Sequence, residues 1–174
     1  MPTFTLHCHP DTPCPFIETF NVSVNFRPEG ELECIYELRG AIDRLAIPGA
    51  GAPLRTNELW RHTCFEVFLR AAGASGYAEF NFSPSSAWAA YRFDKYRTGR
   101  SDIELPGPPR IACRQDRATL ILKASLMNAS HPTQTTQLAV SAVIEDVHGA
   151  LYYWALRHAD GKPDFHHEAA FVAL

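Results

Sequence analysis

The sequence contains no long apolar run and no block of like charge. No stretch approaches the roughly 20 consecutive apolar residues that a membrane-spanning helix needs. The N-terminal segment has neither a basic start nor an apolar core, so no secretory signal is expected and a cytoplasmic protein is predicted. The net charge of −3 is spread along the chain, which argues against nucleic acid or an anionic membrane as the main partner.

Several catalytic and metal-binding motifs are also missing. There is no phosphate-cradling glycine loop, no HExxH and no CxxC, and Gly-Ala-Ser-Gly at 73–76 lacks the spacing of a GxSxG nucleophile elbow. The odd number of cysteines suits reduced thiols. His7 and His9 alternate around Cys8, with Cys14 nearby, which is a conceivable soft-metal site. Solvated histidines are commoner near a terminus, so neither a metal ligand nor a catalytic residue is assigned.

What the sequence does contain is alternation of apolar and polar side chains. Over Glu18–Phe26 every second residue is apolar, which predicts a half-buried strand, and Leu32–Leu38 repeats the pattern. Further strands are predicted at Thr63–Arg70, Tyr77–Ser83, Ser86–Asp94, Ile111–Arg114, Arg117–Ala124, Gln137–Glu145 and Leu151–His158. No amphipathic helix of useful length is present. The 174 residues therefore predict one all-β domain, a two-sheet sandwich with loops at 48–57 and 99–110.

The hairpin over residues 63–83 predicts its own register. Two apolar sets must face the core, namely Phe65, Val67 and Leu69 with Ala78, Phe80 and Phe82. A slip of one residue would expose one of these sets, so the parity of the pairing is determined. The opposite face then carries Glu66 and Phe68 beside Glu79 and Asn81. In the expected register Glu66 lies opposite Asn81, and Phe68 lies opposite Glu79.

The next strand extends this polar face. Ala87, Ala89, Tyr91 and Phe93 form its expected core side. Trp88 and Arg92 then lie beside Glu66 and Asn81, so one face displays carboxylates, an amide, a guanidinium and aromatic rings. That mixture suits a polyhydroxylated small molecule, because ligand sites combine apolar walls with a few placed polar groups. The alternative is an ordinary solvated sheet face, with the tryptophans filling the core.

Two pairs of groups leave an enzymatic alternative open. Asp164 beside His166 forms a conceivable carboxylate–imidazole pair for acid–base chemistry, although polar contacts that pin a loop explain the same residues. Glu66 and Glu79 share a face, and paired carboxylates can hydrolyse glycosides. Neither pair has a recognisable nucleophile or metal frame around it.

Several motifs together resemble the DOMON-like family, which is similar to the family 9 carbohydrate-binding modules. The motifs are Leu59–Leu69, Tyr77–Ser85, Trp88–Phe93, Tyr153–His158 and Lys162–His167. The resemblance spans roughly residues 57–170 and implies an immunoglobulin-like β-sandwich that binds a ligand without catalysis. It places Trp60, Glu66 and Arg92 at the ligand site, with Trp154 as a second aromatic ring. Asn81 joins them from strand parity and not from the family.

Across the broader superfamily the ligands are sugars or haem, so haem is the alternative ligand that the resemblance implies. Haem-binding relatives use Met and His as axial ligands. The methionines here are Met1 and Met127, and no histidine pairs obviously with Met127. The expected ligand is accordingly a small saccharide or similar polyol, with no cofactor assigned.

Overall fold

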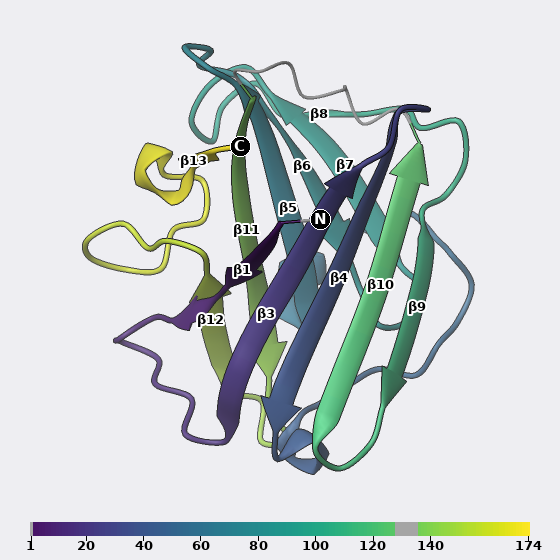
Figure 1. Ribbon diagram of the computed structural model, residues 1–174, viewed down its shortest axis with the longest axis vertical. Coiled ribbons are helices and arrows are strands. Elements are labelled where there is room, and N and C mark those ends of the chain that lie inside the picture. The colour runs from purple at the N-terminus through teal and green to yellow at the C-terminus, as the bar shows by residue number, and fades with distance from the viewer. Residues whose placement is uncertain (1, 128–135) are drawn as a thin grey trace.

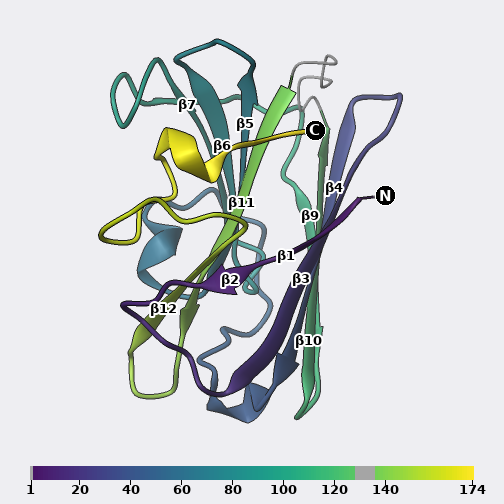
Figure 2. The ribbon, with the colours of Figure 1, turned by 60° about the vertical axis from the view of Figure 1, so that its left-hand side comes forward.

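The computed structural model describes residues 2–127 and 136–174 and consists of two antiparallel β-sheets packed face to face (Figures 1 and 2). The helical segments of the described residues are three short 3-10 turns, η1 (Ile42–Arg44), η2 (Leu59–Arg61) and η3 (Glu168–Ala170). The predicted all-β, two-sheet sandwich is confirmed. None of the helical turns in the described residues is long enough to span a membrane.

The smaller sheet has five strands in the order β1-β3-β4-β10-β9. Their bounds are Thr3–Thr5 for β1, Ile17–Phe26 for β3, Glu31–Gly40 for β4, Thr119–Met127 for β10 and Arg110–Gln115 for β9. The predicted hairpin at the start of the chain forms here, as β3 paired with β4. β1 is too short for its alternation to be recognised in the sequence.

The larger sheet contains the rest of the strands, in the order β2-β12-β11-β5-β6-β7-β8, with β13 paired to β11. Their bounds are His7–Cys8 for β2, Leu151–Ala155 for β12, Thr136–Glu145 for β11, Cys64–Ala71 for β5, Tyr77–Phe82 for β6, Trp88–Phe93 for β7, Ser101–Asp102 for β8 and Val172–Ala173 for β13. β8 falls in a predicted loop, and β13 lies in the C-terminal tail, beyond the last predicted strand.

Aromatic and aliphatic side chains from both sheets fill the space between them. Phe20 on β3 is fully buried, and its ring centroid lies 6.1 Å from that of Phe65 and 5.6 Å from that of Trp154. Tyr36 on β4 is also fully buried and donates a hydrogen bond to the backbone oxygen of Glu66 at 2.9 Å. Burial of a hydroxyl is tolerated when it finds such a partner, so this bond ties the two sheets together.

The register predicted for the β5–β6 hairpin is confirmed. Glu66 pairs with Asn81 and Phe68 pairs with Glu79, while Phe65 and Val67 point into the core between the sheets. Both faces of β5 are nevertheless buried, because a second apolar cluster covers the outer face of the larger sheet. The outer cluster includes side chains from the C-terminal tail, which closes over the sheet.

The N-terminal histidine and cysteine segment is tied to the sheet and is not a frayed end. His9 is 1% exposed, accepts a hydrogen bond from the backbone of Asp11 and lies edge-on to the ring of His158 at 4.8 Å. Cys8 donates its thiol hydrogen to the backbone oxygen of Thr12. All five cysteines of the described chain are free thiols. Among the described residues, no three His, Cys, Asp or Glu side chains gather as metal ligands.

Candidate functional site

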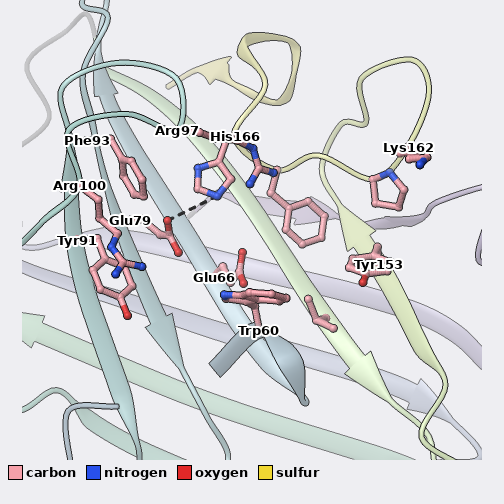
Figure 3. A pocket seen from close by; sticks show the side chains of 13 residues that line it. Trp60, Glu66, Glu79, Tyr91, Phe93, Arg97, Arg100, Tyr153, Lys162 and His166 are labelled. Atoms are coloured by element: carbon pink, nitrogen blue, oxygen red, sulfur yellow. Dashed lines mark ion pairs between the residues drawn. The ribbon is translucent and has the colours of Figure 1, made fainter. Parts of the chain in front are cut away.

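A cavity of about 680 Å³ lies on the outer face of the larger sheet, on the side away from the five-stranded sheet. Figure 2 shows the C-terminal tail and η2 on this outer side, and Figure 3 shows the side chains that surround the opening. The lining residues are Trp60, Glu66, Glu79, Tyr91, Phe93, Arg97, Arg100, Val143, Tyr153, Lys162, Pro163, Phe165 and His166. The walls are therefore mostly aromatic, with cations at the rim and two carboxyl groups at the floor.

The larger sheet and three segments outside it, namely η2, the turn after β7 and the C-terminal tail, build this cavity. Strands β5, β6, β7, β11 and β12 supply the floor through their outward-facing side chains. The 3-10 turn η2 carries Trp60, which is 45% exposed. The turn after β7 carries Arg97 and Arg100, and its Gly99 has a φ of 69° where a Cβ would collide with the carboxylate of Asp94. Glycine adopts such a left-handed conformation without steric cost, and the sharp turn holds the two arginines beside the sheet.

The two floor carboxyl groups are diagonal neighbours on adjacent strands. Because Glu66 pairs with Asn81, Glu79 lies one diagonal step away, which places the Cβ atoms within about 8 Å of each other. Glu66 is 3% exposed and accepts a hydrogen bond from Ser141 at 3.2 Å. Glu79 is 5% exposed and accepts one from the side chain of Asn81 at 2.7 Å. Both carboxyl groups thus have partners inside the protein.

Burial weakens the acidity of both groups. It raises the pKa of Glu66 well above its ordinary value, and the neighbouring Glu79 charge raises that pKa further. It also raises the pKa of Glu79 to about 7, although the hydrogen bond from Asn81 and the charges of Arg97 and Arg100 oppose the shift. A buried carboxylate is costly in a medium of low dielectric constant. Burial therefore favours the protonated form of Glu66, and Glu79, with a pKa of about 7, is divided between its two forms at neutral pH.

His166 covers the floor from the C-terminal tail. Its Nε2 lies 3.8 Å from a carboxyl oxygen of Glu79 (Figure 3). Its Nδ1 lies 2.8 Å from the hydroxyl of Tyr77. The same hydroxyl oxygen accepts a hydrogen bond from the backbone of Arg97 at 3.2 Å. The Tyr77 hydroxyl is therefore placed to donate its own hydrogen to Nδ1. Burial, reinforced by the charge of Arg97, lowers the pKa of His166 to about 4, so the imidazole is neutral at pH 7.

Asp164 pins the tail and does not orient the imidazole. Its carboxylate accepts hydrogen bonds from the Tyr96 hydroxyl at 2.6 Å, from the Arg97 guanidinium at 2.8 Å and from the backbone of His166 at 3.1 Å. Burial alone would raise the pKa of Asp164, but these hydrogen bonds outweigh it and leave the pKa below its ordinary value. The carboxylate–imidazole pair left open by the sequence is not formed, and the loop-pinning interpretation fits the contacts.

Three residues predicted for the ligand site do line this cavity, namely Trp60, Glu66 and Glu79. Asn81 is 1% exposed, pairs with Glu66 across β5 and β6 and donates a hydrogen bond to Glu79, but it is not part of the lining. His166, a secondary candidate, lines the cavity as well, whereas Asp164 lies just behind it. The ligand-binding role of these residues remains a prediction, and the structure supplies their positions.

The predicted placement of Trp88 and Arg92 on the Glu66 side is wrong. Tyr91 pairs with Glu79 on the outer face, which turns the alternate residues of β7 the other way. Trp88 is 7% exposed in the core between the sheets, where its indole nitrogen donates to the backbone of Pro53 at 3.1 Å. Arg92 is exposed opposite Ala78 and lies outside the cavity. The guanidinium groups at the cavity belong to Arg97 and Arg100 instead.

The predicted role of Trp154 as a second aromatic ring at the site is also wrong. Trp154 pairs with Ala142 and packs against Phe20 between the sheets. Its neighbour Tyr153 takes the outward position on β12 and lines the cavity. The motif Tyr153-Trp154 therefore does contribute an aromatic ring to the cavity. That ring belongs to Tyr153, one residue earlier in the chain than expected.

Sequence reasoning missed the cationic rim and most of the aromatic wall. The turn Tyr96-Arg-Thr-Gly-Arg100 could have indicated the cations, because a glycine turn with two arginines follows directly on a strand of the proposed face. Lys162 and Phe165 were visible as part of the tail motif without an assigned role. No local pattern in the sequence shows that the tail folds back over the sheet.

The haem alternative can be compared with the positions of its expected axial ligands. Met127 lies on β10 of the smaller sheet and is 45% exposed, while Met1 lies outside the described residues. Of the residues that line the cavity, His166 is the one histidine, and none is a methionine. The Met–His pair of the haem-binding relatives is therefore not assembled at this cavity within the described chain.

Comparison with solved structures identifies the class of fold. The chain is similar to the crystal structure of "a putative carbohydrate-binding protein" from Bacteroides uniformis ATCC 8492, with a TM-score of 0.67 and 13% sequence identity. The likeness covers 98% of this chain and 84% of that chain. At this sequence identity the likeness shows that the two proteins share a fold, the β-sandwich. No protein-family model and no curated protein sequence matches the chain.

Proposed function

We propose that this protein is a non-catalytic binding module whose cavity takes a small saccharide or similar polyol. The observation that carries the proposal is the combination, in one cavity, of the exposed ring of Trp60 with the buried floor groups Glu66 and Glu79. An aromatic ring offers a flat apolar surface to the C–H face of a sugar, and the polar groups below it can bond hydroxyls. The shared fold with a protein described as carbohydrate-binding supports the same ligand class.

We also infer that the chain is a DOMON-like domain with immunoglobulin-like topology, similar to the family 9 carbohydrate-binding modules. The support is the run of motifs around Trp60, Tyr77 and Tyr153, each of which lies at or beside the cavity. Under this proposal the aromatic side chains of the motifs form the walls. Arg97 and Arg100 supply the guanidinium groups that the resemblance assigned to Arg92. Tyr153 supplies the second aromatic ring that it assigned to Trp154.

Titration with mono- and disaccharides tests the binding proposal. Binding should be measurable at millimolar ligand by calorimetry and by a change in tryptophan fluorescence. That change should come from Trp60, because Trp88 and Trp154 are buried in the core. Trp60→Ala should weaken binding by about tenfold, since an aromatic contact contributes roughly 1 kcal/mol beyond the buried area. Glu66→Gln should weaken it as well.

Met127→Ala is the matched control for Trp60→Ala. Met127 is equally exposed at 45% but belongs to the other sheet, so its loss should leave binding unchanged. Absence of binding to every sugar in the panel at millimolar concentration would contradict the proposal. Binding that Trp60→Ala and Glu66→Gln leave intact would contradict the assigned site.

One observation favours a second function, glycoside hydrolysis. Glu66 and Glu79 line the same cavity as diagonal neighbours, and burial raises the pKa of both carboxyl groups. Glycosidases use one protonated and one ionised carboxyl group on either side of the scissile bond. Release of p-nitrophenol from p-nitrophenyl glycosides, abolished by Glu79→Gln, would favour this function. Saccharide binding without such turnover would favour the binding module.

A further inference from the structure

The rim of the cavity carries three cations. Arg97 and Arg100 come from the turn after β7, and Lys162 comes from the tail, so that they approach from different sides of the opening (Figure 3). Arg97 is paired with Asp164 at 2.8 Å. Within the part of the chain that the structure describes, neither Arg100 nor Lys162 forms an ion pair with an acidic side chain. Two cations are therefore free to meet a ligand.

The acidic groups of the cavity do not balance this charge. The Glu66 and Glu79 carboxyl groups lie at the floor, where they are bonded to Ser141 and Asn81 respectively. Burial raises the pKa of both groups and so favours their uncharged forms, and Glu79, with a pKa of about 7, is only partly charged at neutral pH. The groups that face Glu79 from neighbouring elements are Glu66, His166, Arg97 and Arg100. His166 is neutral at pH 7. The net charge of the cavity is therefore positive, although the net charge of the whole chain is −3.

Arg100 is the cation best placed to contact a ligand that rests on the aromatic wall. Its guanidinium carbon lies 5.0 Å from the centre of the Tyr91 ring, and Tyr91 and Trp60 both line the cavity. Stacking of this kind holds the guanidinium plane while leaving its N–H groups available. Planar, paired N–H donors match the oxygen pairs of a carboxylate or a phosphate. Lys162 adds a point charge on a flexible side chain.

We propose that the ligand of this cavity is an anionic saccharide, whose carboxylate or phosphate group is bound by Arg100 in the field of Arg97 and Lys162 while its ring packs on Trp60. The inference rests on the proposed saccharide-binding function and adds the chemical class of the sugar. A neutral sugar would leave the unpaired guanidinium of Arg100 without an anionic partner. A uronic acid or a sugar phosphate supplies one.

Calorimetric titration of the whole protein with D-glucuronate, glucose 6-phosphate, glucose and inorganic phosphate tests the proposal. At least one anionic sugar should bind about tenfold or more tightly than glucose, as expected for a charge-assisted hydrogen bond. The tighter of the two anionic sugars identifies the acidic group. Arg100→Gln should remove this preference, while Lys162→Gln should reduce it about two- to threefold, as expected for a solvent-exposed charge. Higher salt should weaken the anionic sugars more than glucose.

Arg92→Gln provides the matched control. Arg92 is an exposed arginine on the neighbouring strand β7 but lies outside the cavity, so its loss should leave all affinities unchanged. Circular dichroism of each variant should show that the fold is intact. Equal affinity for glucose and the anionic sugars, or a preference that survives Arg100→Gln, would overturn this inference while leaving saccharide binding in place. Binding of inorganic phosphate as tightly as glucose 6-phosphate would also overturn this inference, because the sugar ring would then contribute nothing. Binding of no sugar at all would overturn the saccharide-binding function as well.

Discussion

At the scale of single residues, Glu79 and His166 give the cavity opposing responses to pH. The pKa of Glu79 is raised to about 7 in the folded protein, so its contribution to stability is full below about pH 4.5 and is lost as the pH rises to about 7. The pKa of His166 is lowered to about 4, so its contribution is full above about pH 6.5 and is lost as the pH falls to about 4. The two pH ranges overlap, so the opposing changes in stability from Glu79 and His166 largely cancel in the wild-type protein.

Glu79→Gln should separate these two effects. Near pH 8 the variant should be more stable than the wild type by roughly 3 kcal/mol at most, because it no longer ionises a buried carboxyl group. Near pH 4 the two proteins should be similar, since Glu79 is then protonated. Urea unfolding at both pH values measures the difference. Glu37→Gln, which alters an exposed glutamate on β4 paired with Arg39, should show no comparable gain, and a variant less stable than the wild type near pH 8 would contradict the argument.

At the scale of elements, the C-terminal tail matters most because it turns a sheet face into a cavity. Asp164→Ala removes the acceptor of three hydrogen bonds, of which those from Tyr96 and Arg97 hold the tail to the turn after β7 and that from His166 lies within the tail. Amides around His166 should exchange with solvent faster, and ligand affinity should fall, while the amides of β5 stay protected. Hydrogen exchange followed by mass spectrometry measures both regions.

Asp116→Ala is the control for this variant. Asp116 accepts two backbone hydrogen bonds, from Ala118 and Thr119, in the turn between β9 and β10 of the other sheet. Its loss should loosen that turn without changing ligand affinity. If Asp164→Ala left exchange in the tail unaltered, the tail would be held by its apolar contacts, among them Phe165 and Phe171.

Strand β7 shows why the face of an element can escape sequence reasoning. Its residues Trp88–Phe93 are apolar at five of six positions, so alternation does not distinguish the two faces. The structure buries both faces of the strand, one against the smaller sheet and one beneath the tail and turn. The connection from β6 then decides which alternate residues of β7 face the core. In this connection the backbone N–H of Ser83 donates a hydrogen bond to the backbone oxygen of Ala87, and Ser86 adopts a φ of 74°. That connection pairs Phe82 with Trp88.

At the scale of the whole molecule, the contact between the two sheets should dominate stability. Phe20→Ala should lower the free energy of unfolding by about 3–5 kcal/mol, because the ring is fully buried among Tyr36, Phe65 and Trp154. Trp60→Ala, by contrast, should change it by about 0.5 kcal/mol or less. Chemical denaturation of both variants measures the contrast. A similar loss for the two would mean that the outer face contributes as much to folding as the core does.

The fold class and the pairing of β5 with β6 could both be predicted from the sequence alone. The apolar residues on the Phe65 side of β5 and on the Phe80 side of β6 can both face the core in one register only. In that register Glu66 and Glu79 lie on the same face of the sheet. Only the tertiary structure decided which other residues join them. Trp154 and Tyr153 are adjacent aromatics on a strand that is apolar or aromatic at every position, so local pattern does not say which one faces the cavity. The rim is assembled from η2, the turn after β7 and the tail, segments that meet through long-range packing.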